Sequence, residues 1–381
     1  MKPWLALICC AALLLFWLLQ QPTPQHATET LDLNNILSTQ SSEAQGFSKA
    51  DRPRTFHFPE DHAAHPGYRI EWWYLTGNLK ASTDRLDNGA EYGYQITLFR
   101  TALQAKTTDR KSAWASNHIW MAHLAVSDIN QQQHYQQQRF SRESLGLAGF
   151  QQQPFKIWLE DWQITSADNG DFPWKITAKD QQFSIDLTVN PLKPAVLQGD
   201  RGLSQKSAEA GNASYYYSFT RLNTTGTLTI VGKKQAVEGL SWLDREWSSS
   251  ALGKDQVGWD WFSLQLNNDE ELMYYRMRNK TGQSDRYSRG KWIKSNSDTI
   301  DLANNDVELT ELEYWQSNTG KTYPISWQLT IPKLSQKLIV KAAIKNQEMR
   351  TSIHYWEGAV TVHETDSQQL IGKGYLEMTG Y

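Results

Sequence analysis

Residues 239–266, GLSWLDREWSSSALGKDQVGWDWFSLQL, indicate the fold class of this chain. Two aromatic groups mark the stretch, Trp242 with Trp247 and then Trp259 with Trp261. From residue 257 onward, aromatic and aliphatic side chains alternate with a period of two, which is typical of a β-strand. We therefore expect strand structure here. The charged residues within the stretch are ones that a simple core strand would exclude.

Asp260 carries the sharpest chemical signal in this stretch. In the expected strand it shares a face with three large apolar side chains. A carboxyl group among apolar neighbours needs a cationic partner, or it holds a proton near neutral pH. Asp260 is therefore either a general acid or half of a buried ion pair with an arginine such as Arg245 or Arg276. The nearby acids Asp244 and Glu246 are further catalytic candidates.

Short alternating segments recur along the rest of the chain. Residues 68–80, YRIEWWYLTGNLK, are a strand candidate in which Glu71 shares a face with Trp73. Beyond residue 21, no segment keeps a helical period for three turns, apart from a short helix candidate at residues 308–315. This pattern predicts an all-β protein. Because both halves open with acid-and-tryptophan strands, we predict two tandem β-barrels or sandwiches, at residues 51–237 and 238–381.

Composition excludes several classes of function. The 381 residues carry a formal net charge of −3 and show no Lys/Arg cluster, which argues against a nucleic-acid partner. The 17 tryptophans lie among polar residues, and the mean hydropathy of −0.61 suits amphipathic strands. The two cysteines, Cys9 and Cys10, both lie in an N-terminal apolar run, so a disulfide framework is excluded.

The N-terminus predicts export. Lys2 precedes an apolar run at residues 4–19, which as a helix spans about 24 Å, between a signal-peptide core and a full membrane span. We interpret residues 1–21 as a signal peptide or membrane anchor and residues 22–50 as a polar linker. The protein is then expected in the periplasm, close to the membrane through residues 4–19.

Sequence motifs of several enzyme classes are absent. The chain has no GxSxG, P-loop, GxGxxG, HExxH or CxxC motif, which leaves serine hydrolase, nucleotide-binding and zinc-protease functions without support. His62 and His65 lie beside Glu60 and Asp61, but this spacing matches no standard set of metal ligands. We expect neither a metal nor a cofactor.

Several long segments carry a family resemblance that covers about residues 55–381. They are FPEDHAAHPGYRIEWWYLTGNL (58–79), YYYSFTRL (215–222), SWLDREWSSS (241–250), QVGWDWFSLQL (256–266), YWEGAV (355–360) and GKGYLEMTGY (372–381). Together they resemble the AttH-like family, which is related to bacterial carotenoid 1,2-hydratases. The resemblance implies two lipocalin-like (calycin) domains and association with an ABC transport system. It also implies that the acid of any hydratase chemistry falls on Asp260.

Three functions remain open from the sequence. The first is a periplasmic protein that binds a hydrophobic lipid or isoprenoid ligand inside a barrel, as an accessory of the transporter permease. The second is a hydratase that adds water to an isoprenoid double bond by acid catalysis. The third is a structural accessory whose aromatic surface contacts a membrane partner. The candidate ligand-binding residues are Trp72, Trp73, Tyr74, Trp242, Trp247, Trp259, Trp261 and Arg245.

Overall fold

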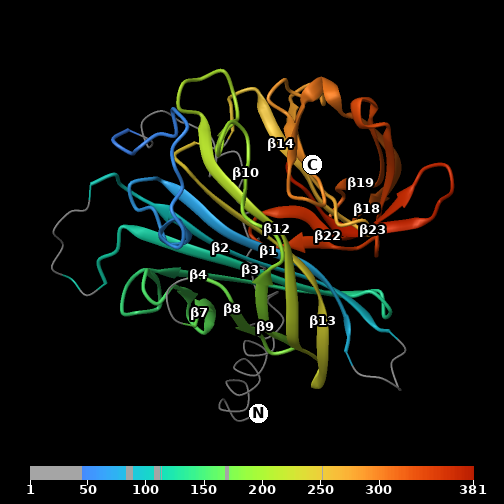
Figure 1. Cartoon of the computed structure of the whole chain (residues 1–381). Helices are drawn as coiled ribbons and strands as arrows, with labels where there is room; N and C mark the ends of the chain where they lie inside the picture. The colour runs from blue at the N-terminus through green and yellow to red at the C-terminus, as the bar shows by residue number, and fades with distance from the viewer. Residues whose placement is uncertain (1–44, 83–88, 107–111, 113, 168–170, 251) are drawn as a thin grey trace, which may run out of the picture.

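The chain folds almost entirely into antiparallel strands. The computed structural model describes residues 45–82, 89–106, 112, 114–167, 171–250 and 252–381. Helical structure in these residues is confined to three short 3-10 turns, η1 (Glu60–His62), η2 (Asn304–Asp306) and η3 (Pro332–Leu334). The strands form two curled sheets, one after the other along the chain (Figure 1). The prediction of an all-β protein with two tandem lipocalin-like barrels is confirmed.

The first sheet has thirteen strands, in the order β4-β3-β2-β1-β13-β12-β9-β8-β7-β6-β5, with β10 and β11 paired to β12. It curls so that β4 lies near β8, and Arg139 Nη2 on β4 donates to the Lys179 carbonyl at 2.9 Å. The strands are β1 (Ile70–Ala81), β2 (Glu91–Ala102), β3 (His118–Asp128), β4 (Gln133–Arg142), β5 (Ala148–Gln151), β6 (Lys156–Leu159), β7 (Trp162–Ser166), β8 (Trp174–Lys179), β9 (Phe183–Pro191), β10 (Val196–Leu197), β11 (Leu203–Gln205), β12 (Ala213–Ile230) and β13 (Lys233–Ser248).

The second sheet has ten strands, in the order β17-β16-β15-β14-β23-β22-β20-β19-β18, with β21 paired to β22. In Figure 1 it curls into a ring, coloured orange to red. The strands are β14 (Gln256–Leu266), β15 (Glu271–Asn279), β16 (Arg289–Ile293), β17 (Thr299–Ala303), β18 (Glu308–Gln316), β19 (Thr322–Ile331), β20 (Gln336–Ala342), β21 (Glu348–Arg350), β22 (His354–Glu364) and β23 (Leu370–Met378).

The central strands of each sheet are buried on both faces. On β1, Trp73 points into the core of the first barrel, whereas Trp72 and Tyr74 point into an aromatic layer between the barrels. On β14, Phe262 points into the second barrel and Trp261 into the same shared layer. Because successive side chains of a strand point to opposite faces, a strand packed on both sides needs consecutive aromatic residues. This explains why tryptophans and tyrosines cluster in these strands.

The structure corrects the predicted domain boundary. Residue 238 lies inside β13, which pairs with β1 from Val237 to Ser248, and the change of sheet falls at residues 249–255. The tryptophans at 242 and 247 therefore belong to the first barrel. The predicted boundary grouped these two tryptophans with Trp259 and Trp261. The two groups look alike in sequence because strands of both barrels contribute aromatic side chains to the shared layer.

The structure also tests the predicted helix at residues 308–315 and the start of the folded region. The short helix expected at residues 308–315 is strand β18. Packing begins before residue 51, because Phe47 and Ala50 are buried and the Ser48 N–H donates to the Gly67 carbonyl at 2.9 Å. Residues 1–21, and most of the predicted linker, lie outside the described residues. Within the described part of the chain, no helix has the length and hydrophobicity of a transmembrane span.

Candidate acid-base site between the barrels

A cavity of about 150 Å³ lies between the two barrels. Strands β1, β2, β3, β12 and β13 form one wall, and β14, β15, β22 and β23 form the other. Its apolar lining includes Trp72, Tyr74, Phe99, Trp259, Trp261 and Met277. Five acidic residues also line it: Asp244, Glu246, Glu357, Glu377 and Glu71, whose carboxylate is engaged by Arg100 and Arg245. The expected ligand site was the interior of a barrel, but this cavity uses the outer faces of both.

Asp244 on β13 is held by three hydrogen-bond donors. Ser218 Oγ donates to it at 2.6 Å and Trp242 Nε1 at 2.7 Å, and the Tyr216 hydroxyl donates to its second oxygen. Trp261 Nε1 donates to the same tyrosine oxygen at 3.2 Å, which directs the tyrosine proton toward Asp244. Burial raises the pKa of Asp244 to about 7, against the effect of the three donors. Asp244 is therefore a fixed acceptor, with both oxygens already engaged.

Glu246 is neutralised by Lys206. The ammonium group of Lys206 lies 3.0 Å from the Glu246 carboxylate and 4.4 Å from the centre of the Tyr275 ring. Burial alone would lower the pKa of Lys206, but the Glu246 charge outweighs it and the pKa is raised. Lys206 therefore stays protonated beside the Glu246 carboxylate.

Glu357 and Glu377 face each other across neighbouring strands. They are register partners on β22 and β23, which places their Cβ atoms about 4.5–5.5 Å apart. Burial, together with the Glu377 charge, raises the pKa of Glu357 well above its usual range. Burial also raises the pKa of Glu377 to about 8, and the Asp244 and Glu246 charges add to this effect. Two carboxyl groups this close do not both ionise, so the pair holds a proton at neutral pH.

The Glu357 carboxyl group interacts with two tyrosine hydroxyls, those of Tyr74 and Tyr355, which oppose the effect of burial on its pKa. Among the described residues, neither oxygen of Glu357 has a hydrogen bond of standard geometry, and the Tyr74 hydroxyl has none either. All three atoms are buried, and both residues line the cavity. Because the pKa of Glu377 is about 8 and the pKa of Glu357 is also raised, a carboxylic acid faces the apolar cavity at neutral pH, which suits general acid catalysis.

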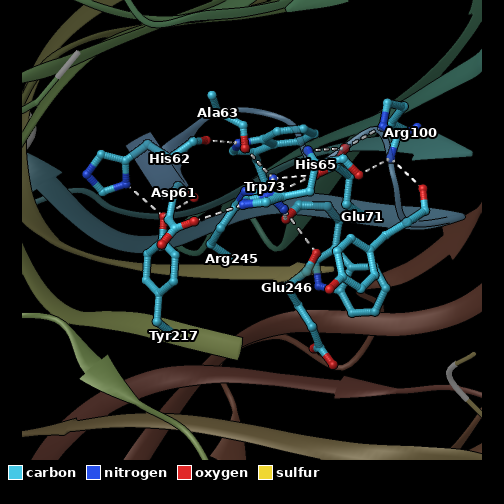
Figure 2. Close-up of polar contacts among 12 residues, drawn as sticks. Asp61, His62, Ala63, His65, Glu71, Trp73, Arg100, Tyr217, Arg245 and Glu246 are labelled. Carbon is cyan, nitrogen blue, oxygen red and sulfur yellow. Dashed lines mark hydrogen bonds and ion pairs between the residues drawn. The ribbon is translucent and has the colours of Figure 1, made fainter. Parts of the chain in front are cut away.

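A second buried charge cluster lies on the other face of β1, inside the first barrel. Figure 2 shows Glu71 between the guanidinium groups of Arg100 and Arg245, which form short ion pairs with it. All three side chains are fully buried. Burial would raise the pKa of Glu71, but the two arginines hold it well below its usual range. In Figure 2, Glu246 points away from this cluster, as the alternation of β13 requires.

The aromatic neighbours of this cluster are core residues of the first barrel. The Arg245 guanidinium lies 3.9 Å from the centre of the Trp73 ring, and His65 stacks on Trp247 at 3.8 Å. Arg245, Trp73 and Trp247, which were predicted to bind ligand, therefore face the barrel interior and not the cavity. His62 is bonded to the Tyr217 hydroxyl at 2.7 Å (Figure 2). No metal-binding cluster is found among the described residues.

Asp260 lies inside the second barrel, away from the cavity lining. Its carboxylate is 2.7 Å from Arg276 Nε and 3.2 Å from Arg278 Nε, and the Tyr381 hydroxyl donates to it at 2.7 Å. This is the ion-pair geometry that the sequence left open, with Arg276 as a partner. Arg245, the other arginine considered, pairs with Glu71 instead.

We expect Asp260→Asn to destabilise the fold by about 3–5 kcal/mol, because it leaves the buried Arg278 without its counter-ion and leaves Arg276 only Glu311, 2.8 Å from its Nη2. Ligand binding in the cavity should be unchanged. Urea unfolding and ligand titration of the same variant check this. Asp255→Asn is the control, since Asp255 and Lys280 are both exposed and pair at 3.6 Å, so this pair should contribute about 1 kcal/mol or less. Equal stability of the two variants would contradict the ion-pair role.

The structure brings together some of the predicted residues and adds others. Trp72, Tyr74, Trp259 and Trp261 line the cavity with Asp244 and Glu246, and Trp242 holds Asp244 from the adjoining layer. The missed residues that carry chemistry are Glu357 and Glu377. The alternation that singled out Asp260 also places Glu357 beside Tyr355 in YWEGAV, and Glu377 beside Tyr375 in GYLEM. Lys206 could not be found from strand alternation, because it lies in a polar connecting segment.

Comparisons with known proteins agree with this architecture. A crystal structure of an AttH protein from Nitrosomonas europaea matches with a TM-score of 0.78 and 30% identity, over 88% of this chain and 100% of that one. Kievitone hydratase from Nectria haematococca matches with a TM-score of 0.64 and 16% identity, over 88% and 95% of the two chains. CghA matches with a TM-score of 0.52 and 11% identity, over 88% and 94%. These last two likenesses show the fold alone.

The family follows from the sequence match rather than from the fold. No curated protein matches the chain. The profile of the AttH-like family, however, matches residues 49–381, which is nearly all of the described structure. The chain therefore belongs to the AttH-like family.

Proposed function

We propose that the protein binds the unsaturated, apolar end of an isoprenoid or aromatic compound between its barrels and adds water across the double bond. The Glu357–Glu377 pair in an aromatic cavity carries this proposal. Burying carboxyl groups costs free energy, and a protein that only held a hydrocarbon would gain nothing from them. The fold shared with kievitone hydratase supports the proposal.

The size of the cavity sets the class of group that it accepts. A volume of about 150 Å³ is that of a dry cavity which accommodates a benzene ring. A single ring or a branched terminal alkene fits this space, whereas the rest of a longer molecule must lie outside it. The proposed ligand therefore enters by one end.

The proposed reaction needs one proton donor and one proton acceptor. The protonated carboxyl of Glu357 gives its proton to the terminal alkene carbon, and the π electrons form the new C–H bond. The neighbouring carbon becomes a tertiary cation, and a water oxygen then forms the C–O bond. The proton lost by that water returns to the Glu357–Glu377 pair, which restores the starting state. No oxidant, reductant or cofactor is consumed.

Aromatic faces around the pair suit a cationic intermediate. Trp72, Trp259 and Trp261 line the same cavity as Glu357. A cation over an indole face is stabilised by about 0.5–2 kcal/mol per contact. Asp244 adds a negative charge in its ionised form, so the electrostatics favour the cation over the neutral alkene.

The direct test is incubation of the purified protein with terminal alkenes, prenylated phenols and polyenes in H₂¹⁸O. The proposal expects an alcohol product that carries one ¹⁸O atom and is absent from a no-protein control. Quenching of tryptophan fluorescence reports binding in parallel. Binding of these compounds without incorporation of ¹⁸O would contradict the hydratase proposal and favour a ligand-binding protein.

Export and association with a transporter permease are proposals of a different kind. Both depend on the N-terminal apolar run and on the family resemblance, and residues 1–44 lie outside the described structure. We propose a periplasmic location on that basis. Fractionation of cells that express the full chain tests it, because recovery of the intact chain in the cytosol would contradict export.

A further inference from the structure

Glutamines on edge strand β4 dock the second barrel onto the first. Gln136 Nε2 donates to the Glu348 carbonyl at 2.9 Å, and the Arg350 N–H donates to Gln136 Oε1 at 2.6 Å. Gln138, on the same face, accepts the Ser352 N–H at 2.9 Å. Two of the three glutamines at residues 136–138 therefore bind the other barrel.

The Gln138 amide fixes the proton of His123. Because Oε1 accepts a backbone N–H, the amide orientation is set and Nε2 is the donor. Nε2 donates to Ser352 Oγ at 2.7 Å and lies 2.8 Å from His123 Nε2. That ring nitrogen must therefore accept. Burial lowers the pKa of His123 to about 3, so the ring is neutral and carries its single proton on Nδ1.

The Nδ1 proton in turn orients Tyr355. His123 Nδ1 lies 2.7 Å from the Tyr355 oxygen, which must accept this proton. The tyrosine's own O–H is then free to point elsewhere. Tyr355 and Glu357 are two residues apart on β22, so they share the face that lines the cavity. The interaction of this hydroxyl with Glu357 opposes the effect of burial on the carboxyl group.

We infer that Gln138 and His123 are positioning residues that aim the Tyr355 hydroxyl proton at Glu357. This inference rests on the proposed function. When Glu357 gives up its proton, a carboxylate develops, and the aimed O–H stabilises it as a charge-assisted donor. This hydrogen-bond relay runs from Gln138 and His123 on the first barrel to Tyr355 on the second. The Tyr355 hydroxyl therefore points at Glu357 only when the two barrels are docked.

Gln138→Glu tests the relay with almost no change of shape. The new carboxylate still accepts the Ser352 N–H but has no proton for His123 Nε2. The ring then moves its proton to Nε2, and Nδ1 accepts from Tyr355, which turns the hydroxyl away from Glu357. We expect kcat to fall by about 10–100-fold, the range for losing a hydrogen bond to a charged group, with KM unchanged. Gln136→Glu is the matched control, because it places the same charge on the same strand and barrel contact.

Nitrogen-15 NMR of the histidine rings reads the tautomer without any turnover. The wild type and Gln136→Glu should show His123 neutral with the proton on Nδ1, and Gln138→Glu should show it on Nε2. The carboxylic-acid infrared band that disappears in Glu357→Gln should shift in Gln138→Glu alone. A wild-type proton on Nε2, or an unshifted band, would overturn the relay. A wild type that hydrates no alkene contradicts the proposed function instead, and leaves the NMR and infrared results to decide the relay.

Discussion

Replacing Glu357 by glutamine is expected to lower turnover by roughly 10²–10⁴-fold, the usual contribution of a positioned acid. The amide keeps the shape of the side chain but has no acidic proton for the alkene. Because the aromatic lining of the cavity is untouched, ligand affinity should change little. Steady-state kinetics, with tryptophan fluorescence titration as the binding measurement, separate these two effects.

Two companion variants sharpen this result. Glu377→Gln removes the other carboxyl of the pair, so it should also reduce turnover. Glu364→Gln is the matched control, since Glu364 is exposed at the end of the same strand, β22. If Glu357→Gln and Glu364→Gln turn over the substrate equally fast, the acid lies elsewhere and the assignment fails.

Glu71→Gln is expected to lower the free energy of unfolding by about 3–5 kcal/mol. The substitution removes the single negative charge between Arg100 and Arg245, which are both fully buried. Backbone carbonyls of Tyr68 and Ala63 accept from the two arginines at 2.8 and 2.7 Å, but they supply no compensating charge. Urea unfolding followed by circular dichroism measures the effect.

Glu238→Gln provides the surface comparison on the neighbouring strand. Glu238 pairs with Lys80 at 3.2 Å, and both side chains are about half exposed. A pair of this kind contributes about 1 kcal/mol or less. The two glutamine variants would contradict this if they unfolded at the same urea concentration and with the same dependence of free energy on urea. The backbone carbonyls would then be enough to stabilise the buried arginines, and the charge of Glu71 would be dispensable for stability.

The fold could be predicted because strand alternation is a local property. The consecutive Trp72, Trp73 and Tyr74 already indicate that both faces of β1 are packed. The candidate site was harder to predict, because alternation does not say which face of a strand points into its barrel and which points into the layer between the barrels. Asp260 and Glu377 both lie among apolar and aromatic side chains in sequence. Their roles differ because each faces a different residue on the neighbouring strand.

Pairing between strands supplies the missing information. Asp260 lies opposite Arg276, so its charge is neutralised inside a barrel, whereas Glu377 lies opposite Glu357, so this pair stays protonated at neutral pH. The partners are separated by 16 and 20 residues of chain, and the register depends on the intervening turns. The domain boundary was misplaced for a related reason, since the similar composition of β13 and β14 hid their membership of different sheets.

The aromatic layer between the barrels also determines how the molecule unfolds. Each barrel presents to its neighbour large apolar side chains, Tyr74 and Trp242 from one and Trp261 and Tyr275 from the other. A lone barrel in water would expose this layer as a contiguous apolar patch, which soluble monomers rarely tolerate. Loss of one barrel therefore weakens the other, and the two should melt as a single cooperative unit without a stable half-folded intermediate.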